Sequence, residues 1–123
     1  MKREQRMTAR EIAALAVQAL EDKKAGDIKA LDISTVSTLG DYFVLCEGTS
    51  TTQVKALADQ VDFFLGQNGV EPDRIEGYQS AGWIVLDYGD VIVHVFHKES
   101  REFYGLERLW ADGKPVAIDE LKK

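Results

Sequence analysis

The sequence contains two histidines and a single cysteine, the residue types that most readily bind transition-metal ions or, for cysteine, act as a nucleophile. His94 and His97 lie three residues apart in VIVHVFH, a stretch whose composition predicts a β-strand. Because side chains along a strand alternate between its two faces, these imidazoles point in opposite directions and cannot bind one ion unless a bulge separates them. Cys46 lies in the apolar stretch FVLCEG, where a thiol packs as a small apolar side chain. The sequence therefore predicts no metal site and no catalytic cysteine.

The stretch EGTSTTQ, residues 47–53, has the composition of a phosphate-binding turn. A predicted strand, Gly48 and the hydroxyl residues Thr49 and Ser50 lead into a helix start, where free N–H groups and the helix dipole favour an anion. Nucleotidyltransferases have a similar start, followed on the next strand by two metal-binding carboxylates that are separated by one residue. The one acid-x-acid triplet here, at residues 71–73, contains a proline, so two-metal chemistry should be absent. A plain turn and helix cap explain the same residues, and residual nucleotide binding stays open.

A third candidate is AGWIVLDYGDVIVHVFH, residues 81–97, which predicts a β-hairpin with a two-residue turn at Gly89 and Asp90. This turn fixes the register of the two strands and therefore the residues on each face. One face is apolar or amphipathic throughout, and we expect it to face the core. Its six residues are Ile84, Leu86, Tyr88, Val91, Val93 and Val95.

The other face of the hairpin mixes aromatic, aliphatic, acidic and histidine side chains, which is typical neither of a solvated face nor of a core. Either a helix covers this face, or it is an exposed patch that binds another protein, since such patches combine tryptophan anchors with polar groups. In the second case Trp83 and Phe96 anchor the partner and Asp87 pairs with one of its basic side chains. His94 then supplies a polar contact. The candidate partner-binding residues are Trp83, Val85, Asp87, Ile92, His94 and Phe96.

Three helices are expected to surround these strands. Thr8 with Glu11, and Ser50 with Gln53, have the spacing of a capping box, in which each side chain bonds the backbone of the other residue. The first helix is expected to stop at Gly26, in the left-handed conformation. We expect a third helix over residues 98–110, with apolar contacts from Phe103, Leu106, Leu109 and Trp110.

The order of elements predicts the fold class. Strands are expected at residues 27–34 and 41–48, the second nearly continuously apolar and therefore central in the sheet. Together with the helices and the hairpin, they predict an α/β (α+β) domain with a mixed β-sheet flanked by helices. We expect one domain over residues 1–123, with a core at about 8–110 and a loosely held tail at 111–123.

Composition restricts the possible partners. The net charge of −6 argues against direct nucleic-acid binding, which normally needs a basic surface. An acidic domain suits a basic protein partner, although the same charge also keeps a small protein soluble.

No apolar run is long enough to cross a membrane. The N-terminus carries no secretion signal and a lone cysteine fits a reducing compartment, so we expect a cytoplasmic location.

Two long stretches carry a family resemblance. DYFVLCEGTSTTQVKALAD and GWIVLDYGDVIVHVFHKESREFYGLERLW resemble the two signature stretches of the ribosomal silencing factor family, also called RsfS or Iojap-related. The similarity runs from about Ile12 to Trp110 and keeps the order of the D-Y-G-D turn, the V-H-V-F strand and the helix that follows. Nothing is carried over to the tail beyond Trp110.

The resemblance implies a non-enzymatic translation factor without a cofactor. Members of this family bind the large ribosomal subunit through its ribosomal protein fourteen and sterically block joining of the small subunit when nutrients are short. The fold that the family implies is related to nucleotidyltransferases but lacks their catalytic acids. Carried over by position, the partner-binding stretch is the strand that contains Gly82, Trp83 and Asp87, together with its hairpin mate.

Two alternatives stay open beside this resemblance. One is a degenerate nucleotidyltransferase that binds a nucleotide at residues 48–50. The other concerns the free protein, because an exposed hairpin patch can pair with the same patch of a second copy and form a homodimer. Such a dimer would compete with partner binding on the same surface.

Overall fold

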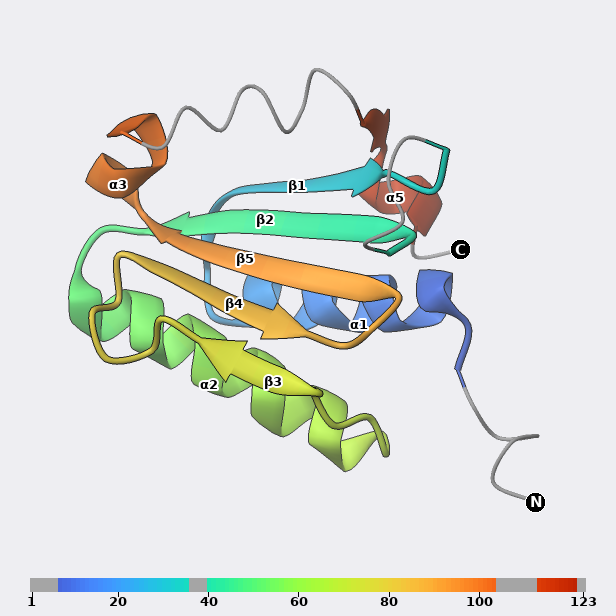
Figure 1. The fold of residues 1–123 in the computed structure, drawn as a ribbon, viewed down its shortest axis with the longest axis horizontal. Coiled ribbons are helices and arrows are strands. Elements are labelled where there is room, and N and C mark those ends of the chain that lie inside the picture. The colour runs from blue at the N-terminus through green and yellow to red at the C-terminus, as the bar shows by residue number, and fades with distance from the viewer. Residues whose placement is uncertain (1–6, 36–39, 104–112, 122–123) are drawn as a thin grey trace.

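The computed structural model describes residues 7–35, 40–103 and 113–121 (Figure 1). Within this part of the chain, six strands form one mixed sheet in the order β3-β4-β5-β2-β1-β6. Only the β2–β5 pair is parallel among these strand pairs, and the neighbouring pairs are antiparallel. The elements are α1 (Ala9–Asp22), β1 (Gly26–Asp32), β2 (Tyr42–Gly48), α2 (Thr51–Gln67), β3 (Arg74–Glu76), β4 (Trp83–Asp87), β5 (Val91–His97), α3 (Lys98–Phe103), β6 (Lys114–Val116) and α5 (Ile118–Leu121).

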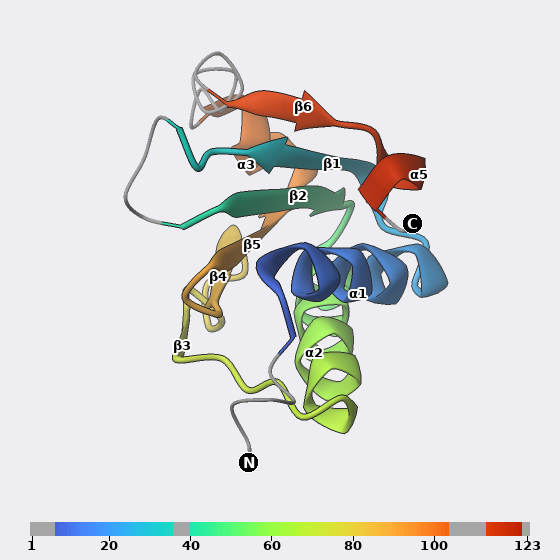
Figure 2. The same cartoon turned by 90° about the vertical axis from the view of Figure 1, so that its right-hand side faces the viewer.

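Helices α1 and α2 lie side by side on one face of the sheet, as both views show (Figure 1, Figure 2). Their apolar stripes and the inward residues of the strands form the larger core. The expected fold, a mixed sheet flanked by helices, is confirmed. None of the helices in the described part of the chain has the length and apolar character needed to cross a bilayer.

The first helix begins as expected and ends differently. The Glu11 N–H donates to Thr8 Oγ1 at 3.1 Å, and the Thr8 N–H donates to Glu11 Oε1 at 2.8 Å, so the capping box is complete. The left-handed stop is Lys24, with φ of 58°, and not Gly26. Gly26 already belongs to β1, where a Cβ would lie only 3.2 Å from Glu47 Cγ on β2. Close approach of two strands therefore explains this glycine.

The hairpin has the expected register. Ile84 lies opposite Val95, Leu86 opposite Val93, and the Tyr88 N–H donates to the Val91 carbonyl at 2.9 Å. Gly89 occupies the turn with φ of 86°, which glycine adopts without strain. All six residues expected on the core face are buried against the helices.

The expectation of a loosely held tail is wrong for residues 114–121. Strand β6 pairs with β1, and α5 packs beside α1, where Arg10 donates to the Glu120 carbonyl and Leu121 is 2% exposed. The third helix is described only as α3, so Leu106, Leu109 and Trp110 lie outside the described residues.

Because Leu121 closes the core at α5, Leu121→Ala is expected to lower the free energy of unfolding by about 2 kcal/mol, the lower end for a buried leucine, since a short terminal helix can readjust. Chemical denaturation of the variant and the wild type measures the difference. A loss below about 0.5 kcal/mol would show that the tail contributes nothing to the core.

Candidate protein-binding face

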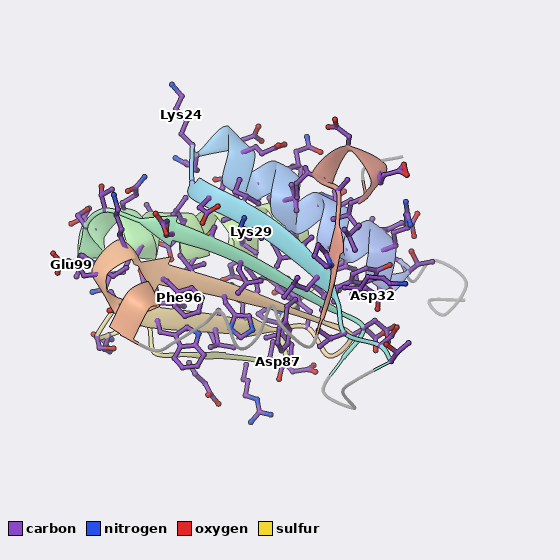
Figure 3. All side chains as sticks on the ribbon, turned by 90° about the horizontal axis from the view of Figure 1, so that it is seen from above. Lys24, Lys29, Asp32, Asp87, Phe96 and Glu99 are labelled. Carbon is purple, nitrogen blue, oxygen red and sulfur yellow. The ribbon has the colours of Figure 1, made fainter. Side chains whose placement is uncertain are left out.

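The face of the sheet away from α1 and α2 carries a second, smaller apolar cluster. It joins β1, β2, β4 and β5, and Figure 3 shows Phe96 and Asp87 on this side, away from α1. We call this surface the second face. Its buried residues are Leu31, Ile33, Phe43, Leu45, Ile92 and Phe96, with Trp83 and Val85 packed against them.

A tryptophan–histidine hydrogen bond organises the second face. Trp83 Nε1–H donates to His94 Nδ1 at 3.1 Å, and the Trp83 ring lies 5.3 Å from the Phe96 ring between centroids. The His94 ring is parallel to that of Phe96, with an angle of 3° between the planes, and its centroid lies 4.6 Å from that of Phe43 in a T-shaped arrangement. The indole therefore has a defined orientation, which ring packing and one polar contact fix together.

The same bond determines which ring nitrogen of neutral His94 carries the proton. Because Nδ1 accepts, the neutral ring carries its proton on Nε2. That nitrogen is buried and has no hydrogen-bond partner within the part of the chain that the structure describes. Burial lowers the pKa of His94 from its ordinary 6.5 to about 4, so the imidazole is neutral at pH 7.

Exposure divides the six candidate residues into two groups. Phe96 is fully buried, His94 is 5% exposed and Ile92 is 9% exposed, so the expectation that these three form an open surface is wrong. They lie on β5, an inner strand between β4 and β2, where side chains have neighbours on both sides. Trp83, Val85 and Asp87 are half-buried and form the accessible row along β4.

Part of this burial comes from the segment expected to be a tail. A Cβ on Gly113 would lie 3.2 Å from Leu31 Cβ and 3.3 Å from Ile33 Cγ2, so Gly113 itself packs directly on the second face. At the other end, α3 follows β5, and a Cβ on Gly82 would lie 3.2 Å from Ser100 Oγ. The second face is therefore partly covered by this chain's own segments, and its more exposed side chains lie on β4.

Asp87 already has partners in this chain. Its Oδ1 accepts from the Gly89 N–H at 2.8 Å, which stabilises the hairpin turn, and its Oδ2 lies 3.4 Å from Arg74 Nε on β3. Arg74 is 66% exposed, so this ion pair is weak. A basic side chain of a partner would have to share the carboxylate with Arg74. Sequence reasoning missed Arg74, because the strand β3 has only three residues.

The glycine–hydroxyl stretch forms a helix cap. Ser50 Oγ accepts from the Gln53 N–H at 3.0 Å, as expected, but Gln53 Oε1 accepts from the Thr49 N–H at 2.7 Å and not from the Ser50 N–H. A Cβ on Gly48 would lie 3.1 Å from Val54 Cγ2, so glycine lets the helix approach the strand. The Thr49 and Gln53 N–H groups are therefore already engaged within the chain, which leaves fewer donors for an anion.

The cap gives a testable prediction. Ser50→Ala is expected to lower the free energy of unfolding by about 1 kcal/mol, because the Gln53 N–H loses its acceptor. Thermal denaturation measures this loss. ATP or GTP with Mg²⁺ should leave the melting temperature of the wild type unchanged, and a rise that Ser50→Ala removes would restore the nucleotide-binding alternative.

The remaining chemistry-bearing side chains are separated. Cys46 is buried in the core, and His97 Nδ1 accepts from the Glu99 N–H at 3.2 Å at the start of α3. Among the described residues, no group of three or more histidine, cysteine or acidic side chains could hold a metal ion.

A family model described as "Ribosomal silencing factor during starvation" matches residues 6–123. The chain belongs to this RsfS family. The resemblance that the two signature stretches carry is thereby confirmed, and the match includes the residues of β6 and α5. Ribosomal silencing factors from Halalkalibacterium halodurans and Bacillus subtilis are each 42% identical over 113 residues, covering 92% of this chain and 97% and 96% of theirs.

Two solved structures have the same fold. A crystal structure of a Chromobacterium violaceum protein is 42% identical and superposes with a TM-score of 0.82 over 89% of this chain and 92% of that chain. One from Bacillus halodurans is 43% identical, with a TM-score of 0.78 over 87% of this chain and 97% of that chain. A more distant mouse relative, "Mitochondrial assembly of ribosomal large subunit protein 1", is 30% identical over 99 residues, and the match covers 43% of its length.

Proposed function

We propose that this protein binds the large ribosomal subunit through ribosomal protein fourteen and sterically blocks joining of the small subunit, as a non-enzymatic repressor of translation in the cytoplasm. The family match over residues 6–123 carries the proposal. The name of the mouse relative also refers to the large ribosomal subunit.

The second face supports a protein partner. Trp83 is the first residue of β4 and is half-buried. Its indole is oriented by the hydrogen bond to His94 and by packing against Phe96. Such an amphipathic ring loses little conformational freedom when a partner covers it, which is why tryptophan is enriched among binding hot spots. Val85 extends the apolar surface along the same strand, and Asp87 adds a carboxylate at its end. We therefore narrow the partner-binding row to these three side chains.

Charge also suits the proposed partner. The chain carries a net charge of −6, and ribosomal proteins that contact RNA are commonly basic. The opposite charge of a basic partner accelerates encounter, whereas the like negative charge of RNA disfavours direct binding of this chain to ribosomal RNA. We therefore expect the protein–protein contact to supply the affinity.

Purified ribosomal protein fourteen tests the proposal directly. Titration into this protein should give a saturable one-to-one complex, and pre-incubation of large subunits with this protein should reduce the light-scattering signal when small subunits are added. Binding without reduced joining would contradict the steric block, and absence of binding would contradict the partner.

Self-association is a related proposal, because a second copy could cover the same row of β4. Gel filtration over a dilution series should then show a dimer at high concentration that ribosomal protein fourteen dissociates. A dimer that persists in the complex would place self-association on another surface.

A further inference from the structure

The opposite side of the molecule carries a hollow that the proposed function does not use. It lies on the outer side of α2 towards its C-terminal end and has a volume of about 460 Å³. Helix α2 covers the helix-side face of the sheet, so this hollow and the second face are separate surfaces (Figure 1). Its lining residues are Asp59, Asp62, Phe63, Gly66, Gln67 and Glu71.

An exposed aromatic ring forms the apolar part of the hollow. Phe63 is 63% exposed, more than any other large apolar side chain of the described residues. It lies outside the buried stripe of α2, so the packing of the core does not require a phenylalanine here. A large, solvent-exposed apolar side chain next to a hollow is a feature of interaction sites.

Carboxylates surround this ring without a compensating cation. Asp62 and Glu71 form no ion pair within the described part of the chain, and Asp59 accepts from the Tyr78 hydroxyl at 3.1 Å. The nearby Lys55 lies over the Tyr78 ring, with its Nζ 5.3 Å from the ring centroid. The hollow therefore presents negative charge next to an aromatic face.

A glycine inside α2 shapes the hollow. Gly66 costs about 1 kcal/mol of helix stability relative to alanine. A Cβ at this position would lie 3.3 Å from Glu71 Oε2, closer than most side chains tolerate. Glycine thus allows the Glu71 carboxylate to lie against the helix, beside Asp62.

A buried tyrosine hydroxyl responds to the charge of the same carboxylates. Tyr88 is 9% exposed, and its hydroxyl has no hydrogen-bond partner among the described residues. Burial raises the pKa of Tyr88, and the negative charges of Asp62 and Glu71 raise it further. The hydroxyl is therefore a buried polar group without a hydrogen bond among the described residues, and it can both donate and accept one.

We infer that this acidic hollow is a docking site for an arginine side chain in a basic segment of a second protein partner. A guanidinium group stacks on an aromatic ring, donates several hydrogen bonds to carboxylates, and is more weakly hydrated than an ammonium group. Phe63 supplies the ring, and Asp62 and Glu71 supply the acceptors. The negative charge excludes an RNA or phosphate ligand, and no group of donors in the described residues suits a metal ion.

An NMR titration with the peptide Ac-Gly-Arg-Leu-Arg-Gly-NH₂ tests this site. Amide shifts should concentrate at α2 and the loop after it, and the peptide with citrulline in place of both arginines should bind about tenfold more weakly, because it keeps the shape and loses the charge. The double variant Asp62→Asn/Glu71→Gln should weaken binding about tenfold, and Phe63→Ala about threefold. The control Asp22→Asn removes an exposed carboxylate of α1 and should change nothing.

Three results would overturn the inference. The citrulline peptide could bind as tightly as the arginine peptide, or spermidine could match the arginine peptide, which would show an unspecific acidic surface. Alternatively, the same amides could shift on concentrating the protein alone, with a dimer in sedimentation, which would make the occupant a second copy. Spectra of each variant should be recorded to check that it remains folded, and none of these readouts involves ribosomes.

Discussion

Replacing Trp83 by alanine is expected to weaken binding of ribosomal protein fourteen by about 30- to 1000-fold. This range corresponds to about 2–4 kcal/mol, the loss typical of a tryptophan that anchors a protein interface. The indole is half-buried on β4, and removing it takes away the ring that a partner would cover. Calorimetric titration of ribosomal protein fourteen into the variant measures the change.

Stability and a matched variant separate binding from folding. Trp83→Ala also removes the ring contact with Phe96, so the melting temperature should fall by a few degrees while the protein stays folded at 25 °C. Ile75 is 38% exposed, and its pairing with Leu86 places it on the helix-side face, so Ile75→Ala should bind normally. Trp83→Ala binding within threefold of the wild type would show that this row is not the interface.

The second large effect is a loss of stability in mild acid that His94 causes. Burial holds the pKa of folded His94 at about 4, against 6.5 in the unfolded chain, so the unfolded state binds the extra proton. The contribution of His94 to the free energy of unfolding should therefore change little above pH 6.5. It should fall by about 3 kcal/mol as the pH decreases from 6.5 to 4.

His94→Gln isolates this contribution. The amide oxygen of glutamine can still accept the Trp83 Nε1–H, but the side chain does not titrate. Urea denaturation between pH 7 and pH 4 should give a steep decrease for the wild type and a shallower one for the variant, with a difference of about 3 kcal/mol. Equal slopes for the two proteins would mean that His94 is charged or solvated in the folded state.

Local signals predicted the parts of the fold that short-range geometry determines. The turn at Gly89 set the register of the hairpin, and the Thr8 capping box set the start of α1. The end of α1 was mispredicted, because both Lys24 and Gly26 can take part in a reversal and only the contact of Gly26 with Glu47 decides between them.

The exposure of the second face could not be predicted from the alternation of side chains along the strands. The pattern places His94 and Phe96 on one side of β5 but does not say that β5 lies between β4 and β2, nor that Gly113 packs on the same face. The tail was missed for a similar reason. Strand β6 has three residues and α5 has four, too few for a periodic signal, and both are fixed by long-range contacts with β1 and α1.

Phe63 shows what a stricter search of the sequence could have found. The buried stripe of α2 consists of Val54, Leu57, Ala58, Val61 and Leu65, and Phe63 falls outside this spacing. A large apolar residue off the stripe of an amphipathic helix indicates either an error in the stripe or an exposed contact. The glycine at position 66 gave no such signal, because its contact with Glu71 appears only in the fold.

Sucrose-gradient sedimentation with separated subunits tests the ribosomal role most directly. The wild-type protein should travel with free large subunits, stay away from small subunits and joined ribosomes, and shift joined ribosomes toward free subunits when added in excess. Protein that remains at the top of the gradient, or that sediments with joined ribosomes, would contradict a factor that occupies the joining face of the large subunit.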